Sequence, residues 1–363
     1  MAFKYNTEAL KNLQITDTSV LDPLVDVDSA RETHMNKDPS HRDKRMSMAE
    51  AVNEFVHDGD IWADTGFGYV RGPLQGWYEV IRQGKKNLSA IGAPNATHTY
   101  SVHYGTVAYS HASYTGAEMR GYDKDYSRNL KKGRVKIISE WSHGAAALGF
   151  KAAQLGVPAI YSKQMLGSDM LKYNPYLHVV QNPFRRESDP VVAIPAIYPD
   201  FTIVHVHKAD RFGNAWFYGP SVNDIAIAAA SRRVIITAEE IVPPSEMQNV
   251  QQGAVIPSMY VDAVVELPYG SVPGMMPGHY YFARQWWTKM LKVTAEEKTA
   301  KEFFDYWLID CKNQYDFVEK LGGSYWLAQA RRQTRVSEGL NDDEGFDFTW
   351  NDWHEGMDPE IFY

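Results

Sequence analysis

Short apolar runs that resemble strands alternate with helical segments along the middle of the chain, and this order limits the fold more than any other feature. The segments are VKIISE, GAAALGFKAAQLG and VPAIYS between residues 135 and 162, then FTIVHVH, VNDIAIAAASR and RVIITA between residues 201 and 238. Such alternation predicts an α/β domain with an open, mostly parallel sheet and helices on both faces. The strands are too irregularly spaced to predict an eightfold barrel.

The same order begins upstream, around a glycine-rich turn. Ser47 and Glu50 have the spacing of a capping box, which predicts a helix that ends near Gly59. The run IWADTG then reads as a strand, and the turn GFGYVRGP at 66–73 joins it to an amphipathic helix. A glycine-rich turn between a strand and a helix can point backbone N–H groups at an anion. Its spacing is neither G-x-G-x-x-G nor a Walker pattern, so the turn alone does not define a nucleotide site.

Acidic residues are concentrated at the C-terminal end. Of the 45 Asp and Glu, nine lie in 338–363, which has no Lys or Arg, and this leaves 36 acidic against 37 basic residues in the rest of the chain. A nearly neutral body offers no basic face, so we expect no nucleic-acid partner. Six aromatic residues are interleaved with the acidic ones, and we therefore expect this segment to pack on the body or on a partner.

Cysteine and histidine usage indicates a cytoplasmic protein without a metal site. Cys311 is the only cysteine, which excludes a disulfide within the chain and a cysteine-based metal cluster. The histidines form no metal-binding set by spacing, so we expect neither a metal nor a permanently bound cofactor. The first residues lack the apolar core of a signal peptide, and no run is apolar enough to span a bilayer. We therefore expect a cytoplasmic setting with no membrane association.

These patterns divide the chain into three parts. Residues 1–45 are polar and predict an irregular N-terminal arm, 46–322 carry the α/β pattern, and 323–363 are expected to form an acidic, aromatic tail. Within the middle part, residues 268–283 (PYGSVPGMMPGHYYFA) contain three Gly and three Pro among Tyr, Met and His. Such a segment is typical of either a long connection or a lid over a site.

Two groups of histidines have to be interpreted. His205 and His207 alternate along one strand and so share a face, where hydrogen-bonded core or subunit-interface residues are more common than a zinc site that lacks a third ligand. Ser142 precedes His143 at a strand-to-helix junction. Adjacent residues do not normally present the geometry of a nucleophile and its base, and we expect Ser142 to cap the helix.

An ordered set of motifs resembles the α-type subunit of the class I coenzyme A transferases, particularly that of glutaconate CoA-transferase. The resemblance covers about residues 47–322, and upstream HDGDIWADTGFGYVRGP has Thr65 where the family has the first of two paired glycines. The other matching segments are ADRFGN at 209–214, the small-residue helix at 225–230, EEIV at 239–242 and VDAVVELPYG at 261–270.

The resemblance implies a CoA-transferase-like fold and an enzyme that moves CoA from an acyl thioester to a carboxylate. In this family a glutamate attacks the thioester and is then converted to a glutamyl-CoA thioester, and that glutamate belongs to the β-type subunit. We find no equivalent within residues 47–322, so the resemblance implies a β-type partner in a hetero-oligomer such as α2β2. It also implies that Glu239 and Glu240, where the strand VIITA ends, are structural.

The motifs and the resemblance together give candidate site residues, with an acyl-CoA thioester as the expected substrate. Within this chain we expect His143 and Glu140 to be the catalytic candidates, with the main nucleophile on the partner. The substrate- or CoA-binding candidates are Gly66, Phe67, Gly68, Gly167, Ser168 and Asn214.

Two other functions stay open. Some relatives of this kind hydrolyse a carbon–carbon bond in cyclic CoA thioesters, and there an acidic residue precedes the glycine of the corresponding helix. Ser142 and His143 occupy that stretch here, and His143 or Glu140 could act as a general base on water. The third function is a non-catalytic homo-oligomer that binds acyl-CoA. Aromatic-rich loops favour a bulky or apolar acyl group, although the same residues also fill cores.

Overall fold

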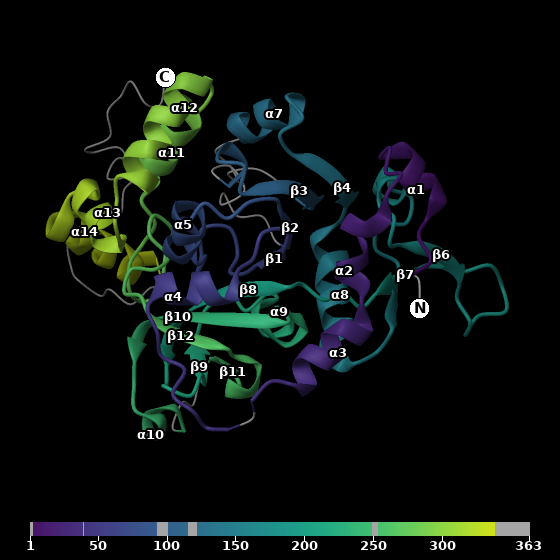
Figure 1. The fold of residues 1–363 in the computed structure, drawn as a ribbon, viewed down its shortest axis with the longest axis horizontal. Coiled ribbons are helices and arrows are strands. Elements are labelled where there is room, and N and C mark those ends of the chain that lie inside the picture. Colours follow the sequence, from purple (N-terminus) through teal and green to yellow (C-terminus); the bar gives the residue numbers. More distant parts are fainter. Residues whose placement is uncertain (1–2, 39, 93–100, 115–121, 249–252, 338–363) are drawn as a thin grey trace.

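The computed structural model describes residues 3–38, 40–92, 101–114, 122–248 and 253–337. Within these residues the core is a nine-stranded, mostly parallel sheet surrounded by helices (Figure 1). Its strands are β1 (Ile61–Asp64), β2 (Leu88–Gly92), β3 (Val107–Ala112), β4 (Lys136–Glu140), β8 (Phe201–Ala209), β9 (Ala215–Phe217), β10 (Arg233–Ile241), β11 (Ala254–Ile256) and β12 (Ala263–Glu266). The predicted open α/β sheet is thus confirmed.

The strand order places a topological switch point in the middle of this sheet. From β1 the chain adds β2, β3 and β4 outward on one side; later it returns to β8, beside β1, and adds β10 and β12 on the other side. All these neighbours are parallel, so their carboxyl ends lie along one edge. In open α/β sheets, ligands bind beyond that edge at the point where the strand order reverses. A site is therefore expected beyond β1 and β8.

Successive residues of the central strands point to opposite faces, which different helices cover. In β1, Trp62 packs with α4 and α5, whereas Ile61 and Ala63 pack with α8 and α9. The predicted capping box at Ser47 and Glu50 is present at the start of α4. These helices are α4 (Met48–Phe55), α5 (Leu74–Arg82), α8 (His143–Leu155) and α9 (Asp224–Ala230). Helices cover both faces, as the sequence predicts.

The N-terminal arm is helical, so the expectation of an irregular segment over residues 1–45 is wrong. Leu21 and Leu24 are fully buried in the core on the α8 face. Arg232 Nη2 donates to the carbonyl oxygens of Pro23 and Asp26, each at 3.0 Å. The helices are α1 (Thr7–Asn12), α2 (Asp22–Val25) and α3 (Val27–Met35). Helices this short depend on tertiary contacts, so local sequence gives little sign of them.

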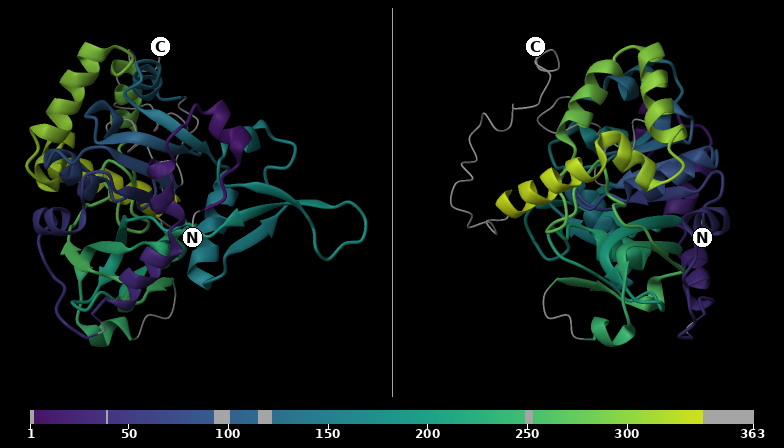
Figure 2. Two further views of the ribbon diagram at one scale, coloured as in Figure 1. Left: turned by 45° about the vertical axis from the view of Figure 1, so that its right-hand side comes forward. Right: turned by 90° about the vertical axis from the view of Figure 1, so that its left-hand side faces the viewer.

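A second, three-stranded antiparallel sheet projects from the side of the domain (Figure 2). Its strands are β5 (Ala159–Ser162), β6 (His178–Gln181) and β7 (Pro190–Pro195), with β7 in the middle. The strand predicted over 157–162 is present as β5. It pairs with β7 and does not extend the parallel sheet, so the simple alternation of strands and helices breaks at this point.

The C-terminal helices pack aromatic side chains against the α5 face of the sheet. Trp286, Trp287, Phe304 and Phe317 are buried there. The helices are α11 (Arg284–Val293), α12 (Glu297–Phe304), α13 (Gln314–Leu321) and α14 (Gly323–Ser337). None of the helices in the described part of the chain is long and apolar enough to cross a membrane.

The boundary expected at residue 322 does not end the helical region. Gly322 caps α13 with a φ of +119°, as a helix-ending glycine should, but α14 begins at the next residue. Residues 323–337 are therefore helical and not part of a tail. The predicted packing of the acidic, aromatic segment 338–363 lies outside the described residues.

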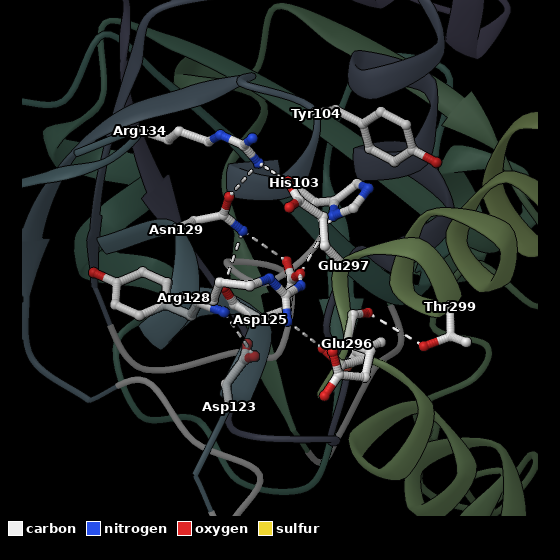
Figure 3. A network of polar contacts seen from close by, with 12 residues as sticks. His103, Tyr104, Asp123, Asp125, Arg128, Asn129, Arg134, Glu296, Glu297 and Thr299 are labelled. Atoms are coloured by element: carbon white, nitrogen blue, oxygen red, sulfur yellow. Dashed lines mark hydrogen bonds and ion pairs between the residues drawn. The ribbon is translucent and has the colours of Figure 1, made fainter. Parts of the chain in front are cut away.

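A buried polar network fastens the C-terminal helices to the domain (Figure 3). Asp125 in α7 (Lys124–Lys131) is fully buried; it pairs with Arg128, and it accepts a hydrogen bond from Asn129 Nδ2 at 2.9 Å. Arg128 Nη1 donates to the carbonyl oxygens of Thr294 and Ala295 at 2.8 and 2.6 Å. These contacts join α7 to the start of α12, so the network serves the fold.

Three buried histidines predict that acid destabilises the fold. Burial lowers the pKa of His103 to about 4 and the pKa values of His111 and His207 to about 3. An unfolded histidine has a pKa of about 6.5, so below that pH the unfolded state binds more protons than the folded state. The free energy of unfolding should therefore fall between about pH 6.5 and pH 4, by on the order of 1–2 kcal/mol per histidine. Urea unfolding at several pH values measures this slope. His111→Asn should make it shallower, and an unchanged slope in that variant would contradict the prediction.

Candidate active site

The glycine-rich turn leaves β1 at the switch point. Gly66 and Gly68 have φ values of +76° and +58°, in the left-handed region that glycine adopts without strain. Phe67, between them, is 40% exposed. A Cβ on Gly66 would lie 2.6 Å from the carbonyl oxygen of Val70, so the turn is tightly closed on itself. The structure therefore places these three predicted binding residues where the fold rule expects a ligand.

A buried ion pair holds this turn. The side chains of Arg71 and Asp224 are fully buried, with Arg71 Nη2 2.9 Å from Asp224 Oδ2. Asp224 Oδ1 accepts hydrogen bonds from Arg71 Nη1 at 3.2 Å and from the Gly66 backbone N at 3.0 Å. Arg71 also donates to the carbonyl oxygen of Pro220, and its guanidinium carbon lies 4.1 Å from the centre of the Phe217 ring. The pair therefore ties the turn to the start of α9.

Residues 268–283 form a packed layer against the same turn. The Arg71 backbone N donates to the Met275 carbonyl oxygen at 2.8 Å, and the Met275 N donates to the Tyr69 carbonyl oxygen at 2.6 Å. Met276 and Tyr280 are almost completely buried. Of the two interpretations of this segment, the structure favours a long, fixed connection that supports the turn.

Glu239 anchors that connection. Its carboxylate accepts hydrogen bonds from Tyr280 Oη at 2.5 Å and from the Tyr269 backbone N at 2.8 Å, and it lies 2.8 Å from His205 Nε2. Burial raises the pKa of this carboxyl, but the contacts with His205, Tyr280 and Tyr269 outweigh it and hold the pKa below its usual value. His205 Nδ1 lies 2.9 Å from Thr237 Oγ1. Glu239 is therefore a structural carboxylate, as the resemblance implies.

The neighbouring members of both pairs also have structural surroundings. His207 is buried, with Nε2 2.9 Å from the Pro277 carbonyl oxygen and its ring stacked on Tyr218 at 4.3 Å. Glu240 has an exposed side chain 3.9 Å from Lys208 Nζ. The prediction that His205 and His207 are hydrogen-bonded core residues is confirmed. Across the described residues, no group of three or more His, Cys, Asp or Glu could hold a metal ion.

The two catalytic candidates lie at the carboxyl end of β4. Ser142 caps α8, as predicted, because its Oγ accepts a hydrogen bond from the Ala145 N at 3.1 Å. The next residue, His143, has Nδ1 2.9 Å from Oγ of Ser113, which follows β3. Glu140 ends β4, and burial raises the pKa of its carboxyl. A half-buried histidine and a carboxyl with a raised pKa, at the same strand end, can supply general acid or base chemistry.

Gly167 and Ser168 belong to the loop that follows β5. Gln164 in this loop lies beside the start of α8, with Oε1 3.4 Å from Ser142 Oγ. Gly167 has a φ of +78°, and a Cβ there would meet nothing within 4 Å. Ser168 Oγ accepts a hydrogen bond from the Met170 N at 3.1 Å. Ligand contact by Gly167 and Ser168 stays a prediction.

Asn214 stabilises the turn between β8 and β9. Its Nδ2 donates to Asp210 Oδ2 at 2.8 Å, and its Oδ1 accepts a hydrogen bond from the Ser258 N at 3.2 Å. Both ends of the amide are therefore engaged within the protein, and its role in ligand binding stays a prediction.

The candidates thus form two groups along the carboxyl edge of the sheet. The turn at 66–68 follows β1, and Glu140 and His143 follow β4, three strands away in the order β1-β2-β3-β4. Three strand spacings amount to about 14 Å. An elongated ligand lying across this edge would meet both groups.

An open parallel sheet with a glycine-rich turn at its switch point defines an α/β ligand-binding domain. The chain belongs to the coenzyme A transferase family, whose model matches residues 45–267. An uncharacterized protein of Archaeoglobus fulgidus is 38% identical over 323 residues, which cover 87% of this chain and 71% of that protein. A 3-oxoadipate CoA-transferase chain of Pseudomonas knackmussii, the first of that enzyme's subunits, is 29% identical and is covered over 97% of its length, with 76% of this chain.

A solved structure shows the same architecture. Glutaconate coenzyme A-transferase from Acidaminococcus fermentans matches with a TM-score of 0.74 and 27% identity, over 79% of this chain and 95% of that one. The resemblance to α-type subunits, the fold class and the assignment as a CoA-transferase-type enzyme subunit are therefore confirmed.

Sequence reasoning did not identify Arg71, Asp224 or Ser113. Arg71 and Asp224 are far apart in the chain, so no local spacing links them. Asp224 stands in the first turn of a helix, where an acidic residue is common for electrostatic reasons alone. The signal available for Ser113 was its position just after a strand of the parallel sheet.

Proposed function

We propose that this chain is the α-type subunit of an enzyme that transfers coenzyme A between an acyl-CoA thioester and a carboxylate. The observation that carries the proposal is the closed glycine turn at the switch point, in a chain of the coenzyme A transferase family. The 3-oxoadipate CoA-transferase relative supports a CoA thioester as the substrate. We propose a cytoplasmic enzyme that needs no permanently bound cofactor.

A β-type partner supplies the nucleophile in this proposal. Attack on a thioester carbonyl needs an accessible, ionised carboxylate. Of the carboxylates at the carboxyl edge described above, Asp224 is buried against Arg71 and Glu239 is buried against His205. Glu140 is less buried, but its raised pKa disfavours the ionised form. These surroundings support a hetero-oligomer, such as α2β2, in which a glutamate of the other chain reaches the turn.

The reaction proceeds through two covalent states on that glutamate. Its carboxylate attacks the thioester carbonyl, the carbon–sulfur bond breaks, and an acyl-glutamyl anhydride and CoA thiolate result. The thiolate then attacks the glutamyl carbonyl and releases the acyl group as its carboxylate, leaving a glutamyl-CoA thioester. The acceptor carboxylate reverses both steps. In this chain, Gly66 and Gly68 let the thioester approach the backbone closely.

Hydrolysis of a CoA thioester is the second candidate, and the contact between His143 and Ser113 is the observation that favours it. A histidine whose Nδ1 is hydrogen-bonded is held in one orientation, which leaves Nε2 to face a water molecule. In that case water, and not a carboxylate, would receive the acyl group.

Labelled water separates the two reactions. For the transferase, turnover should require the acceptor carboxylate, isotope from the water should not enter the product acid above background, and His143→Ala should retain most of its activity. The measurement is mass spectrometry of the product acid, made on the complex with its partner. Acceptor-independent turnover with label in the product, lost in His143→Ala by about 100-fold or more, would replace transfer with hydrolysis.

A further inference from the structure

We propose that Asp224 and Arg71 are positioning residues for this enzyme: their ion pair holds the glycine turn in the conformation that receives the thioester. The proposal rests on the proposed function, because that function makes the turn part of the site. Neither residue needs to contact the substrate, since both side chains are fully buried.

The backbone of the turn requires such support. Gly66, Gly68 and Arg71 all have left-handed φ values, and that of Arg71 is +56°. Arginine carries a Cβ, so this conformation is strained and persists only where the surrounding structure determines it. Such residues are concentrated at sites where a particular backbone geometry serves function.

The contacts of the pair converge on the turn. Asp224 Oδ1 accepts the Gly66 N–H at 3.0 Å while both of its oxygens bind the guanidinium of Arg71. The guanidinium is also fixed by Phe217 and the Pro220 carbonyl oxygen. One carboxylate thus determines both ends of the strained segment and attaches it to the first turn of α9, across the switch point from β1.

Stability alone does not account for a buried ion pair at this position. Removing two charges from water is costly, and apolar residues of similar volume often replace a buried pair without loss of stability. Here the same carboxylate also satisfies a backbone N–H group of the turn, which an apolar residue could not do. The pair therefore specifies a geometry, and a positioning role explains why the charges lie there.

The test compares Asp224→Asn, Arg71→Met and the double variant in the full-length chain. Hydrogen exchange measured by mass spectrometry should be at least about tenfold faster in peptides that cover residues 62–75 of each variant, with little change elsewhere. In the complex with the β-type partner, kcat should fall at least about tenfold, and KM for the thioester should change less. The double variant leaves no unpaired buried charge, so it should regain much of its thermal stability but not its kcat.

Asp125→Asn is the matched control, because Asp125 and Arg128 form another buried pair, in the network remote from the turn. It should lower the melting temperature while exchange at 62–75 and kcat stay at wild-type values. A double variant with wild-type exchange and kcat would overturn the positioning role, as would faster exchange spread evenly over the chain. If the wild-type complex transfers no CoA, the proposed function fails, and the exchange comparison still decides whether the pair holds the turn.

Discussion

Replacing Gly66 with valine should reduce turnover by about 100-fold or more, while most of the chain stays folded. A Cβ at this position would lie 2.6 Å from the Val70 carbonyl oxygen, 2.8 Å from the Arg71 carbonyl carbon and 2.8 Å from the Gly72 N. These are backbone atoms, so no side chain can move aside, and the φ of +76° adds strain. The turn must therefore open and move away from the switch point. Turnover per folded molecule, with folding checked by circular dichroism, measures the effect.

Gly59→Val is the matched control for this change. Gly59 also has a left-handed backbone, with a φ of +85°, but a Cβ there would meet nothing within 4 Å. It precedes β1 and so lies at the opposite end of that strand from the turn. It should lower the free energy of unfolding by about 1–2 kcal/mol and leave turnover unchanged. Equal losses of turnover in both variants would show that left-handed strain, and not the geometry of the turn, determines the result.

Glu239→Ala should cost more stability than any other single change considered, about 3–5 kcal/mol. The substitution removes the acceptor shared by Tyr280 Oη and the Tyr269 N, and it leaves buried His205 without its carboxylate. Unsatisfied buried donors pay their full desolvation cost. The segment 268–283 should then loosen, and the turn it supports should loosen with it. Urea unfolding gives the loss in free energy, and hydrogen exchange locates it.

The contribution of Glu239 should also depend on pH. Its folded-state pKa lies below the usual value, so the stabilisation is fully present above the unfolded pKa of about 4.3 and is lost as the pH falls through the folded value. The difference between wild type and Glu239→Gln should therefore be constant near neutral pH and shrink below about pH 4. Glu240→Ala, next to it but exposed, should change stability by less than about 0.5 kcal/mol. Similar losses in both variants would contradict the structural role given to Glu239.

The sequence predicts the elements whose signal is local. The capping box at Ser47 determines the start of α4, and the alternation along β8 places His205 and His207 on one buried face. The helices of the arm and the strands β6 and β7 were missed, because their stability comes from residues distant in the chain. Arg232 holding the carbonyl oxygens of Pro23 and Asp26 is one such contact.

The candidate site follows the same division. The glycine turn and the strand end at Glu140 could be predicted, because glycine spacing and strand boundaries are read locally. The residues that fix the turn could not, because Asp224 is 153 positions from Arg71. Likewise, Ser113 meets His143 only because β3 and β4 are neighbours in the sheet. The glutamates in EEIV could be interpreted only once Glu239 was seen beneath residues 268–283.

The central claim is that the nucleophilic carboxylate comes from another chain, and trapping the covalent intermediate tests it most directly. The complex would be mixed with an acyl-CoA, reduced with borohydride, which converts a glutamyl-CoA thioester to the alcohol, and digested for mass spectrometry. The account predicts a reduced glutamate in a peptide of the β-type partner, with this chain unmodified and inactive when purified alone. A reduced carboxylate in this chain, at Glu140 for example, together with turnover in the absence of any partner, would contradict it.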